Sequence, residues 1–401
     1  MALSSHNPSS PSLCHVLHTM NVGGAEILAK QYALRAADGF NVVFACLDEL
    51  GELGSGLRDA GFTVEVIGRK PGFDMRCVWN LSRMFKKYDV KAIHAHQYGP
   101  FLYSAIARRL SGSPPILFLE HGRAYPDYRR PKRVFANRFL LCKKDRVAAV
   151  GEDVRQALIS YEGISGDRVE VVYNGIDLSA YDSQRKLRNE VRQELQYDDD
   201  DQIVIQVARL NHLKDHVTAI RAIGKLSQEF PKLKLLLAGD GEERHSLEQL
   251  INELNLEDKV QLLGSRNDVP RLLQAADMFL LSSISEGIPL TLIEAMASGL
   301  PCVSTDVGGT SEVIDHEKNG LLAEKGNPDD IADKLSMLLT DKMRAKQMAE
   351  AGYAQAHQRF SDLKMHQRYN QIYCEMLGIS PAIPGSQSQK QATESCTAEI
   401  V

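Results

Sequence analysis

The most constraining feature of this sequence is the regular alternation of short apolar runs with helix-forming stretches along most of its length. In the first half the strand candidates are Cys14–Met20, Asn41–Leu47, Thr63–Ile67, Val90–His94, Ile116–Glu120, Val147–Val150 and Val169–Tyr173. In the second half they are Ile203–Val207, Leu233–Ala238, Val260–Leu263, Met278–Leu281, Cys302–Thr305 and Leu321–Ala323. This rhythm is typical of doubly wound parallel sheets. The sequence therefore predicts two α/β domains.

The domain boundaries are predicted where the alternation of strands and helices is interrupted. A charged helical segment near Lys186–Leu195 and an acidic run, Asp198–Asp201, mark the change from one domain to the next. Ser361 has the position of an N-cap for a last helix that ends near Leu377. We predict a disordered start at 1–12, a first domain at 13–180, a second at 181–360, a returning helix at 361–380 and a disordered tail at 381–401, which is rich in Pro, Ser and Gln.

The composition is that of a soluble globular protein. Of the 401 residues, 43% are apolar and 25% charged, and no apolar run approaches the length needed to span a bilayer. The N-terminal residues lack the pattern of a secretory signal. The seven cysteines have no C-x-x-C spacing, which argues against a zinc site and against a disulfide framework. We expect a cytoplasmic protein.

The net charge of −5 hides an asymmetry between the two halves. Residues 1–185 carry 24 Lys and Arg against 19 Asp and Glu, whereas residues 186–401 carry 23 against 33. The excess gathers in a basic cluster, Arg129, Arg130, Lys132, Arg133, Arg138, Lys143, Lys144 and Arg146. Such a cluster faces either an anionic membrane or acceptor, or simply solvent. It lacks the motifs and interleaved aromatic residues of a nucleic-acid surface.

Two acids eight positions apart straddle a predicted helix start at Ser285–Ala297. Pro289 suits a first helical turn, Leu290 and Ile293 begin an apolar face, and the strand candidate Met278–Leu281 precedes the turn. Backbone N–H groups at such a helix start attract phosphate. Glu294 is then placed to accept from vicinal ribose hydroxyls and Glu286 from a second polyol. Ordinary surface acids are the alternative.

Other strand ends are rich in glycine and charge. Gly23-Gly24 follows the first strand and gives backbone amides room to approach a phosphate, and a histidine-glycine pair, His121-Gly122, ends the fifth. His94 and His96 end the fourth strand. Each of these histidines either contacts a ligand or is structural.

The second domain repeats this pattern. Arg209 and Lys214 follow a strand and suit a clamp on a diphosphate. Gly239-Asp240-Gly241 ends the next strand, and Asp306-Val307-Gly308-Gly309 with Glu312 ends another. Their recurrence at successive strand ends favours a ligand site.

The motifs V-A-R-L-x3-K, G-D-G-E and S-E-G-I-P-L-T-L-I-E-A-M-A-S-G-L-P-C-V-S-T-D-V-G-G, with G-G-A-E, E-H-G and N-G-I-D in the first domain, resemble those of the retaining, nucleotide-sugar-dependent glycosyltransferases of family four. The resemblance spans roughly residues 13–378. It implies a GT-B fold, in which two Rossmann-like domains face each other across a cleft and the last helix returns to the first domain.

The resemblance also implies roles for single residues. Arg209 and Lys214 would hold the donor diphosphate, Glu294 the ribose and Glu286 a hydroxyl of the donor sugar, while His121 would contact that sugar near the reacting carbon. The donor would also meet Gly23, Gly24, Gly264, Arg266, Gly287, Ile288, Leu290 and Thr291. Pro289 departs from members that have glycine there, and it cannot donate an N–H, so Ile288, Leu290 and Thr291 must supply the phosphate contacts.

The expected reaction is hexosyl transfer to a carbohydrate or lipid-linked acceptor, in polysaccharide, lipopolysaccharide or glycolipid synthesis, with no cofactor and no metal. We expect the enzyme in the cytoplasm or peripheral at the inner face of the membrane. Two alternatives stay open: a nucleotide-sugar 2-epimerase, for which we identify no acid/base carboxylates in the first domain, and a non-catalytic nucleotide-sugar-binding subunit.

Overall fold

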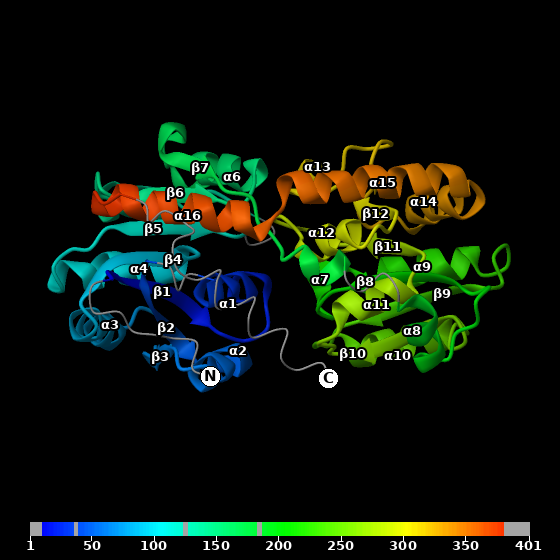
Figure 1. Ribbon diagram of the computed structural model, residues 1–401, viewed down its shortest axis with the longest axis horizontal. Helices are drawn as coiled ribbons and strands as arrows, with labels where there is room; N and C mark the ends of the chain where they lie inside the picture. The colour runs from blue at the N-terminus through cyan, green and yellow to red at the C-terminus, as the bar shows by residue number, and fades with distance from the viewer. Residues whose placement is uncertain (1–9, 36–38, 123–126, 183–186, 381–401) are drawn as a thin grey trace, which may run out of the picture. The chain divides into compact units, whose positions relative to one another are not determined.

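The computed structural model describes residues 10–35, 39–122, 127–182 and 187–380 (Figure 1). The predicted disordered segments therefore lie almost wholly outside the described residues, although Ser12 already belongs to the first strand. Among the described residues, no helix is both long and apolar enough to cross a membrane.

A parallel sheet of seven strands forms from the first half of the chain. Its spatial order is β3-β2-β1-β4-β5-β6-β7. The strands are β1 Ser12–Thr19, β2 Asn41–Glu49, β3 Thr63–Val66, β4 Val90–His96, β5 Ile116–Glu120, β6 Arg146–Ala149 and β7 Val169–Val171. Between them come α1 Gly24–Arg35, α2 Gly51–Asp59, α3 Met75–Lys87, α4 Tyr98–Ala107, α5 Pro131–Leu140 and α6 Glu152–Glu162, with 3₁₀ turns η2 Arg108–Leu110 and η3 Gly166–Arg168.

A second parallel sheet of six strands has the order β10-β9-β8-β11-β12-β13. Its strands are β8 Gln202–Val207, β9 Leu233–Ala238, β10 Val260–Gly264, β11 Met278–Leu281, β12 Cys302–Thr305 and β13 Leu321–Ala323. The helices are α7 Ser179–Asp182, α8 Arg188–Glu194, α9 His216–Leu226, α10 Arg244–Glu253, α11 Val269–Ala275, α12 Leu290–Ala297, α13 Thr310–Val313, α14 Pro328–Thr340, α15 Lys342–Arg359 and α16 Asp362–Leu377, with η4 His212–Lys214. All thirteen predicted strands are confirmed.

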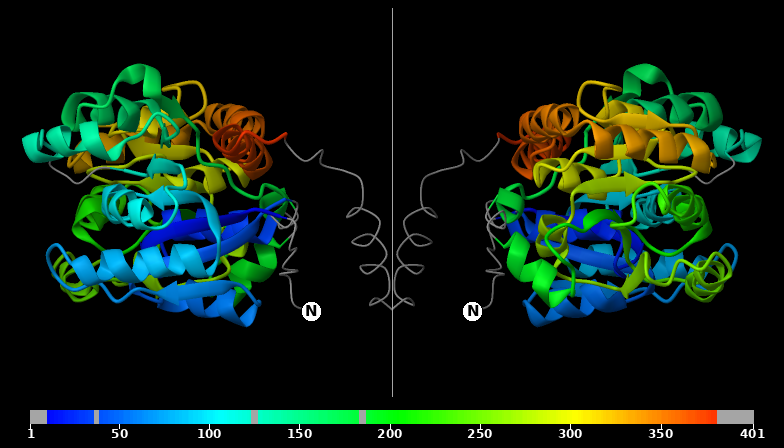
Figure 2. Two further views of the ribbon diagram at one scale, coloured as in Figure 1. Left: turned by 90° about the vertical axis from the view of Figure 1, so that its left-hand side faces the viewer. Right: turned by 90° about the vertical axis from the view of Figure 1, so that its right-hand side faces the viewer.

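Helices cover the strands of each sheet, as Figures 1 and 2 show. In the second half, α14 packs on α9 and α12 packs on α15. The core there is aliphatic, with Val204, Leu235, Leu280 and Val303 buried on the strands. Strands buried under helices read as continuous apolar runs, which is why the sequence predicts them well.

The chain divides into two compact units. Residues 1–119, 135–147 and 366–401 form unit 1, and residues 120–134 and 148–365 form unit 2. Most of α16 thus belongs to unit 1, where Tyr373 hydrogen-bonds His94 at 2.7 Å and Asn370 accepts from Tyr32 at 2.7 Å.

Each sheet has a switch point, where the strand order reverses direction. In the first sheet it lies between β1 and β4, and in the second between β8 and β11. Open α/β sheets bind ligands outside the carboxyl ends of the strands at such points. The segments that follow these four strands are therefore where binding residues are expected.

Candidate functional site

The segments that follow β8 and β11, in unit 2, meet at the switch point of the second sheet. Lys214 Nζ lies 2.5 Å from Glu286 Oε1, and the Ser283 hydroxyl donates to the same oxygen at 2.6 Å. The Glu286 side chain is only 8% exposed and that of Lys214 is 25% exposed. The structure thus brings together two residues predicted to contact the donor.

Two polar residues hold Lys214 in position: Gln206 in the largely apolar strand β8, and Ser282 directly after β11. The Ser282 hydroxyl contacts the carbonyl groups of Lys214 and Asp215 at 3.0 and 2.9 Å, and Gln206 Nε2 donates to the Lys214 carbonyl at 3.2 Å. Asp215 has a left-handed backbone, with φ 44°, and its side chain caps α9. Sequence analysis did not single out Gln206 and Ser282. Their signal in the sequence was a polar side chain within or directly after an apolar run.

Arg209, the other predicted diphosphate ligand, points elsewhere. Its side chain is 67% exposed and pairs with Glu242 at 3.2 Å. Glu242 belongs to the G-D-G-E motif, whose glycines pack on the Arg209 turn: a Cβ on Gly239 would lie 1.9 Å from the Ala208 carbonyl oxygen. The predicted clamp thus has Lys214 beside Glu286 and Arg209 on an exposed turn.

The start of α12 differs from the prediction by one residue. Pro289 was predicted to lie in the first helical turn, but it occupies the N-cap position, with φ −74° and ψ 114°, and the helix begins at Leu290. Asn174 holds the preceding residue, because its side-chain amide donates to the Ile288 carbonyl at 3.2 Å. This bond keeps the chain extended up to Pro289. The N–H groups of Leu290 and Thr291 then belong to the first turn, whose donors have no partner within the helix.

Backbone segments pack around Gly287 so closely that side chains do not fit. A Cβ on Gly287 would lie 2.2 Å from the His121 carbonyl oxygen. A Cβ on Gly308 would lie 2.0 Å from the Glu286 carbonyl oxygen, and one on Gly309 would lie 2.2 Å from that of Gly287. The glycines after β12 therefore support the turn that carries Glu286.

Glu294 lies in α12, half-buried, and its carboxylate accepts a hydrogen bond from the buried Tyr181. Burial raises its pKa to about 7, and the bond from Tyr181 opposes part of that rise. Its carboxyl group therefore titrates near neutral pH.

His121 is half-buried, and burial lowers its pKa to about 4. Its imidazole is therefore neutral at physiological pH. A neutral imidazole can hydrogen-bond to a hydroxyl group without adding charge to the site.

His94 and His96, which sequence analysis left as either ligand-contacting or structural, are structural. Both are buried, and with His15 they form a cluster in unit 1. Their nitrogen atoms lie within 4.8 Å of one another, as in a metal site. However, the rings of His94 and His96 stack at 4.1 Å with an angle of 19°, so both cannot point a nitrogen lone pair at one ion.

The remaining predicted donor residues are placed as follows. Gly264 ends β10 with φ 70°, and its carbonyl accepts from Gly239 N at 2.8 Å. Arg266 makes a bidentate pair with Asp268, at 2.8 and 2.7 Å, so its charge is already engaged. Gly23 and Gly24 belong to unit 1, where Gly24 begins α1 and the Gly23 carbonyl accepts from Ile27 N at 2.9 Å.

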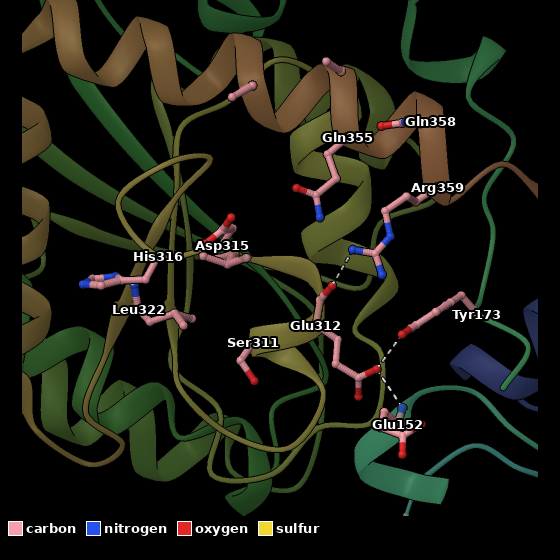
Figure 3. Close-up of a pocket in the computed structure, with 13 residues that line it drawn as sticks. Glu152, Tyr173, Ser311, Glu312, Asp315, His316, Leu322, Gln355, Gln358 and Arg359 are labelled. Atoms are coloured by element: carbon pink, nitrogen blue, oxygen red, sulfur yellow. Dashed lines mark hydrogen bonds between the residues drawn. The ribbon is translucent and has the colours of Figure 1, made fainter.

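Glu312 joins the start of α6 to the second sheet (Figure 3). Its carboxylate accepts from the N–H groups of Glu152 and Asp153 at 2.7 and 2.9 Å and from the Tyr173 hydroxyl at 2.9 Å. An anion at a helix N-terminus is stabilising. The groups line a cavity of about 890 Å³ that none of the predicted donor residues lines. Glu312 is therefore a structural cap.

Two family profiles match the chain: "Glycosyl transferases group 1" at residues 188–355 and "Glycosyltransferase Family 4" at residues 22–180. N-acetyl-alpha-D-glucosaminyl L-malate synthase of Bacillus anthracis is 29% identical over 311 residues, which are 77% of this chain and 80% of the relative. UDP-Gal:alpha-D-GlcNAc-diphosphoundecaprenol alpha-1,3-galactosyltransferase of Escherichia coli is 26% identical over 84% of this chain and 89% of the relative.

Among solved structures, Anabaena Alr3699/HepE in complex with UDP superposes with a TM-score of 0.77 at 23% identity, over 91% of this chain and 99% of that one. At this identity the likeness shows the fold alone. It confirms the prediction that the chain forms two Rossmann-like domains.

Proposed function

We propose that this chain, which belongs to glycosyltransferase family 4, is a retaining, metal-independent enzyme that moves a sugar from a nucleoside-diphosphate sugar to an acceptor hydroxyl. The observation that carries the proposal is the meeting of Lys214 and Glu286 at the switch point of the second sheet. An ammonium group beside a carboxylate offers one partner to a leaving diphosphate and one to a sugar hydroxyl.

The leaving group would be a nucleoside diphosphate, whose departure places negative charge on phosphate oxygens. Lys214 and the first N–H groups of α12 supply positive charge at the second sheet's switch point, and such preorganised donors lower the barrier where charge develops. This arrangement needs no divalent ion. Glu294 would accept from the ribose hydroxyls, and the neutral His121 would contact the donor sugar.

The donor class draws further support from the Anabaena structure, which holds UDP. The acceptor class draws support from the Escherichia coli relative, whose name gives a diphosphoundecaprenol-linked sugar as acceptor. We propose a carbohydrate or lipid-linked acceptor in polysaccharide, lipopolysaccharide or glycolipid synthesis. The basic cluster at 129–146 would hold the protein, as a peripheral cytoplasmic enzyme, at an anionic membrane surface.

The decisive experiment is a thermal-shift panel of nucleotides and nucleotide sugars, followed by transfer assays with the donor that stabilises the protein most. A ligand at 100 times its Kd should stabilise the fold by about 2.7 kcal/mol. Transfer that survives a chelator, with an α-linked product from an α-linked donor, supports the proposal. Conversion of the donor sugar to its 2-epimer, or donor binding without turnover, would favour one of the two alternatives.

A further inference from the structure

The switch point of the first sheet carries a second polar cluster, which sequence analysis did not predict. His18 and Asp48 lie at the carboxyl ends of β1 and β2, and Arg69 follows β3. The register between β1 and β2 shifts at His18, and such irregularities re-aim a side chain. All three side chains belong to unit 1 and are between 24% and 32% exposed. We call them the strand-end cluster.

The segments after β1 and β4 meet at this cluster. The His18 ring lies over Gly99, where a Cβ would come within 2.5 Å of the ring. Gln97, which precedes α4, has a left-handed backbone with φ 72°. A non-glycine residue in that conformation costs roughly 1–3 kcal/mol, and such strain gathers at functional sites.

The charges within the cluster cancel. Arg69 makes a bidentate pair with Asp48, with Nε and Nη2 at 2.7 and 2.8 Å from the two carboxylate oxygens. His18 Nδ1 lies between the two partners, 3.2 Å from Arg69 Nη2 and 3.4 Å from Asp48 Oδ2. Burial, and after it Arg69, lower the pKa of His18, and Asp48 opposes part of that shift, so the neutral ring is favoured.

An aromatic platform adjoins the cluster. The Arg69 guanidinium lies 5.7 Å from the centre of the buried Tyr103 ring, and Phe73 stacks on Tyr103 at 5.7 Å with an angle of 17°. The Tyr103 hydroxyl donates to the Gly72 carbonyl at 3.1 Å and accepts from Asp74 N at 2.9 Å, which fixes the ring. Phe73 is 59% exposed and so presents a flat apolar face to solvent.

Neutral hydrogen-bonding groups beside an exposed aromatic face suit an uncharged sugar. A pyranose stacks its C–H face on an aromatic ring and offers hydroxyls to a carboxylate, which has lone pairs left after binding Arg69. An anionic acceptor would find no uncompensated cation in the cluster, because Asp48 already neutralises Arg69. The neighbouring Glu49 and Lys70 carry opposite charges.

We infer that the strand-end cluster and Phe73 form the acceptor subsite, and that its ligand is an uncharged glycosyl unit. This inference rests on the proposed function. Phe73 would stack on the sugar, Asp48 would accept from its hydroxyls, and His18 would offer Nε2 as a further hydrogen-bonding atom.

Ligand-detected NMR on the full chain, with UDP present, tests the inference. The probes are the methyl glycosides of glucose, galactose, N-acetylglucosamine and N-acetylgalactosamine, with L-malate and glycerol 1-phosphate as anionic probes. We expect at least one glycoside to bind, and we expect Phe73→Ala to lower the affinity for that glycoside about tenfold. Phe135→Ala is the matched control, since Phe135 is 63% exposed in the same unit. Asp48→Asn should weaken binding of the glycoside and allow the anionic probes to bind, because Arg69 loses its charged partner. The control Glu65→Gln breaks an exposed ion pair with Lys87 and should change neither.

Binding of the anions alone to the wild type, no glycoside binding, or glycoside binding that Phe73→Ala and Asp48→Asn leave unchanged would overturn the inference. Calorimetry with UDP on the same samples separates this failure from a failure of the proposed function. If UDP binds and no glycoside does, only the acceptor subsite is wrong. If UDP and the nucleotide sugars do not bind at all, the proposed function is wrong.

Discussion

The two switch points occupy equivalent places in the two sheets, yet they carry charge differently. Between β8 and β11, Lys214 makes a single contact with Glu286, so the ammonium group keeps donors for a further partner. Beside the switch point of the first sheet, Arg69, which follows β3, is bidentate to Asp48 at the end of β2. The first arrangement leaves a cation able to meet an anionic ligand, and the second presents neutral polarity. If both proposals hold, the two sheets bind different kinds of ligand because the acid makes one bond to its basic partner in one sheet and two in the other.

The largest expected effect concerns backbone packing at the second sheet's switch point. Gly287→Ala would place a Cβ 2.2 Å from the His121 carbonyl oxygen and displace the turn that carries Glu286. We expect kcat to fall by more than about 10²-fold, since small misplacements at a reacting centre cost that much. Overpacking should also cost roughly 1–3 kcal/mol of stability.

Gly122→Ala is the control on the other side of the same contact, where a Cβ would lie 3.9 Å from Gly287 N. Kinetics and thermal unfolding should barely change. An equal loss of kcat and of thermal stability in both variants would show that close packing around Gly287 is not the cause.

Glu286→Ala should lower kcat by something on the order of 10²-fold, because this acid would orient the transferring sugar. The bare nucleoside diphosphate should bind nearly as well as to the wild type. The matching change in unit 1, Asp48→Asn, should also leave nucleotide affinity unchanged. Calorimetry with UDP checks both, and weaker UDP binding by Glu286→Ala alone would mean that its role and that of Glu294 are exchanged.

Lys214→Ala should weaken nucleotide binding by roughly 1.5–3 kcal/mol, the usual worth of a charge-assisted hydrogen bond. Arg69→Met removes a cation at the other switch point and should not alter nucleotide affinity, because Arg69 is already neutralised. Unchanged affinity in a folded Lys214→Ala protein would remove this lysine from the diphosphate site.

Glu294 should make nucleotide binding depend on pH. Burial raises its pKa to about 7, and the ionised carboxylate is the better acceptor for ribose hydroxyls, so affinity should rise severalfold between pH 6 and 8. Glu294→Gln should bind more weakly at pH 8 and show a flatter profile.

The same shift in pKa affects stability with the opposite sign. The folded protein holds the Glu294 proton that the unfolded chain releases, so this group favours folding below pH 4.5 and loses that contribution as pH rises through 7. A glutamine at this position should remove that part of the slope in denaturant titrations.

The basic cluster should affect membrane binding and leave the two switch points unchanged. Lys143→Glu with Lys144→Glu should weaken co-sedimentation with vesicles that contain anionic lipid, at about 1 kcal/mol per charge. Added salt should do the same, because the screening length is about 8 Å at physiological ionic strength. The control pair, Lys342→Glu with Lys346→Glu, changes exposed lysines on α15 and should have no effect. Equal binding of wild type to neutral and anionic vesicles would contradict the membrane proposal.

Most of the fold could be predicted from the sequence because buried parallel strands are apolar throughout. The turn that carries Glu286 was also predictable, since close backbone packing leaves glycines at fixed places, such as Gly287 and Gly309. Pro289 was predicted to lie in the first turn of α12, but it is the N-cap residue. The hydrogen bond from Asn174, far away in the sequence, to the Ile288 carbonyl helps to hold the extended backbone before it.

The strand-end cluster could not be predicted in the same way. Its residues come from three strands with no common motif, and their only signal is a polar residue where an apolar strand ends. The histidines of β4 looked more functional than His18, yet a helix near the C-terminus covers them. No local pattern carries that information.

That covering helix has a consequence for how the protein is made. Tyr373, which hydrogen-bonds His94, follows it by 279 positions. At 5–20 residues per second, a ribosome needs roughly 15–55 s to synthesise the stretch between them. Throughout that time the nascent β1–β4 sheet has no α16 to cover its histidines. The first domain to be synthesised is therefore among the last to be completed, because part of its core is supplied by the end of the chain.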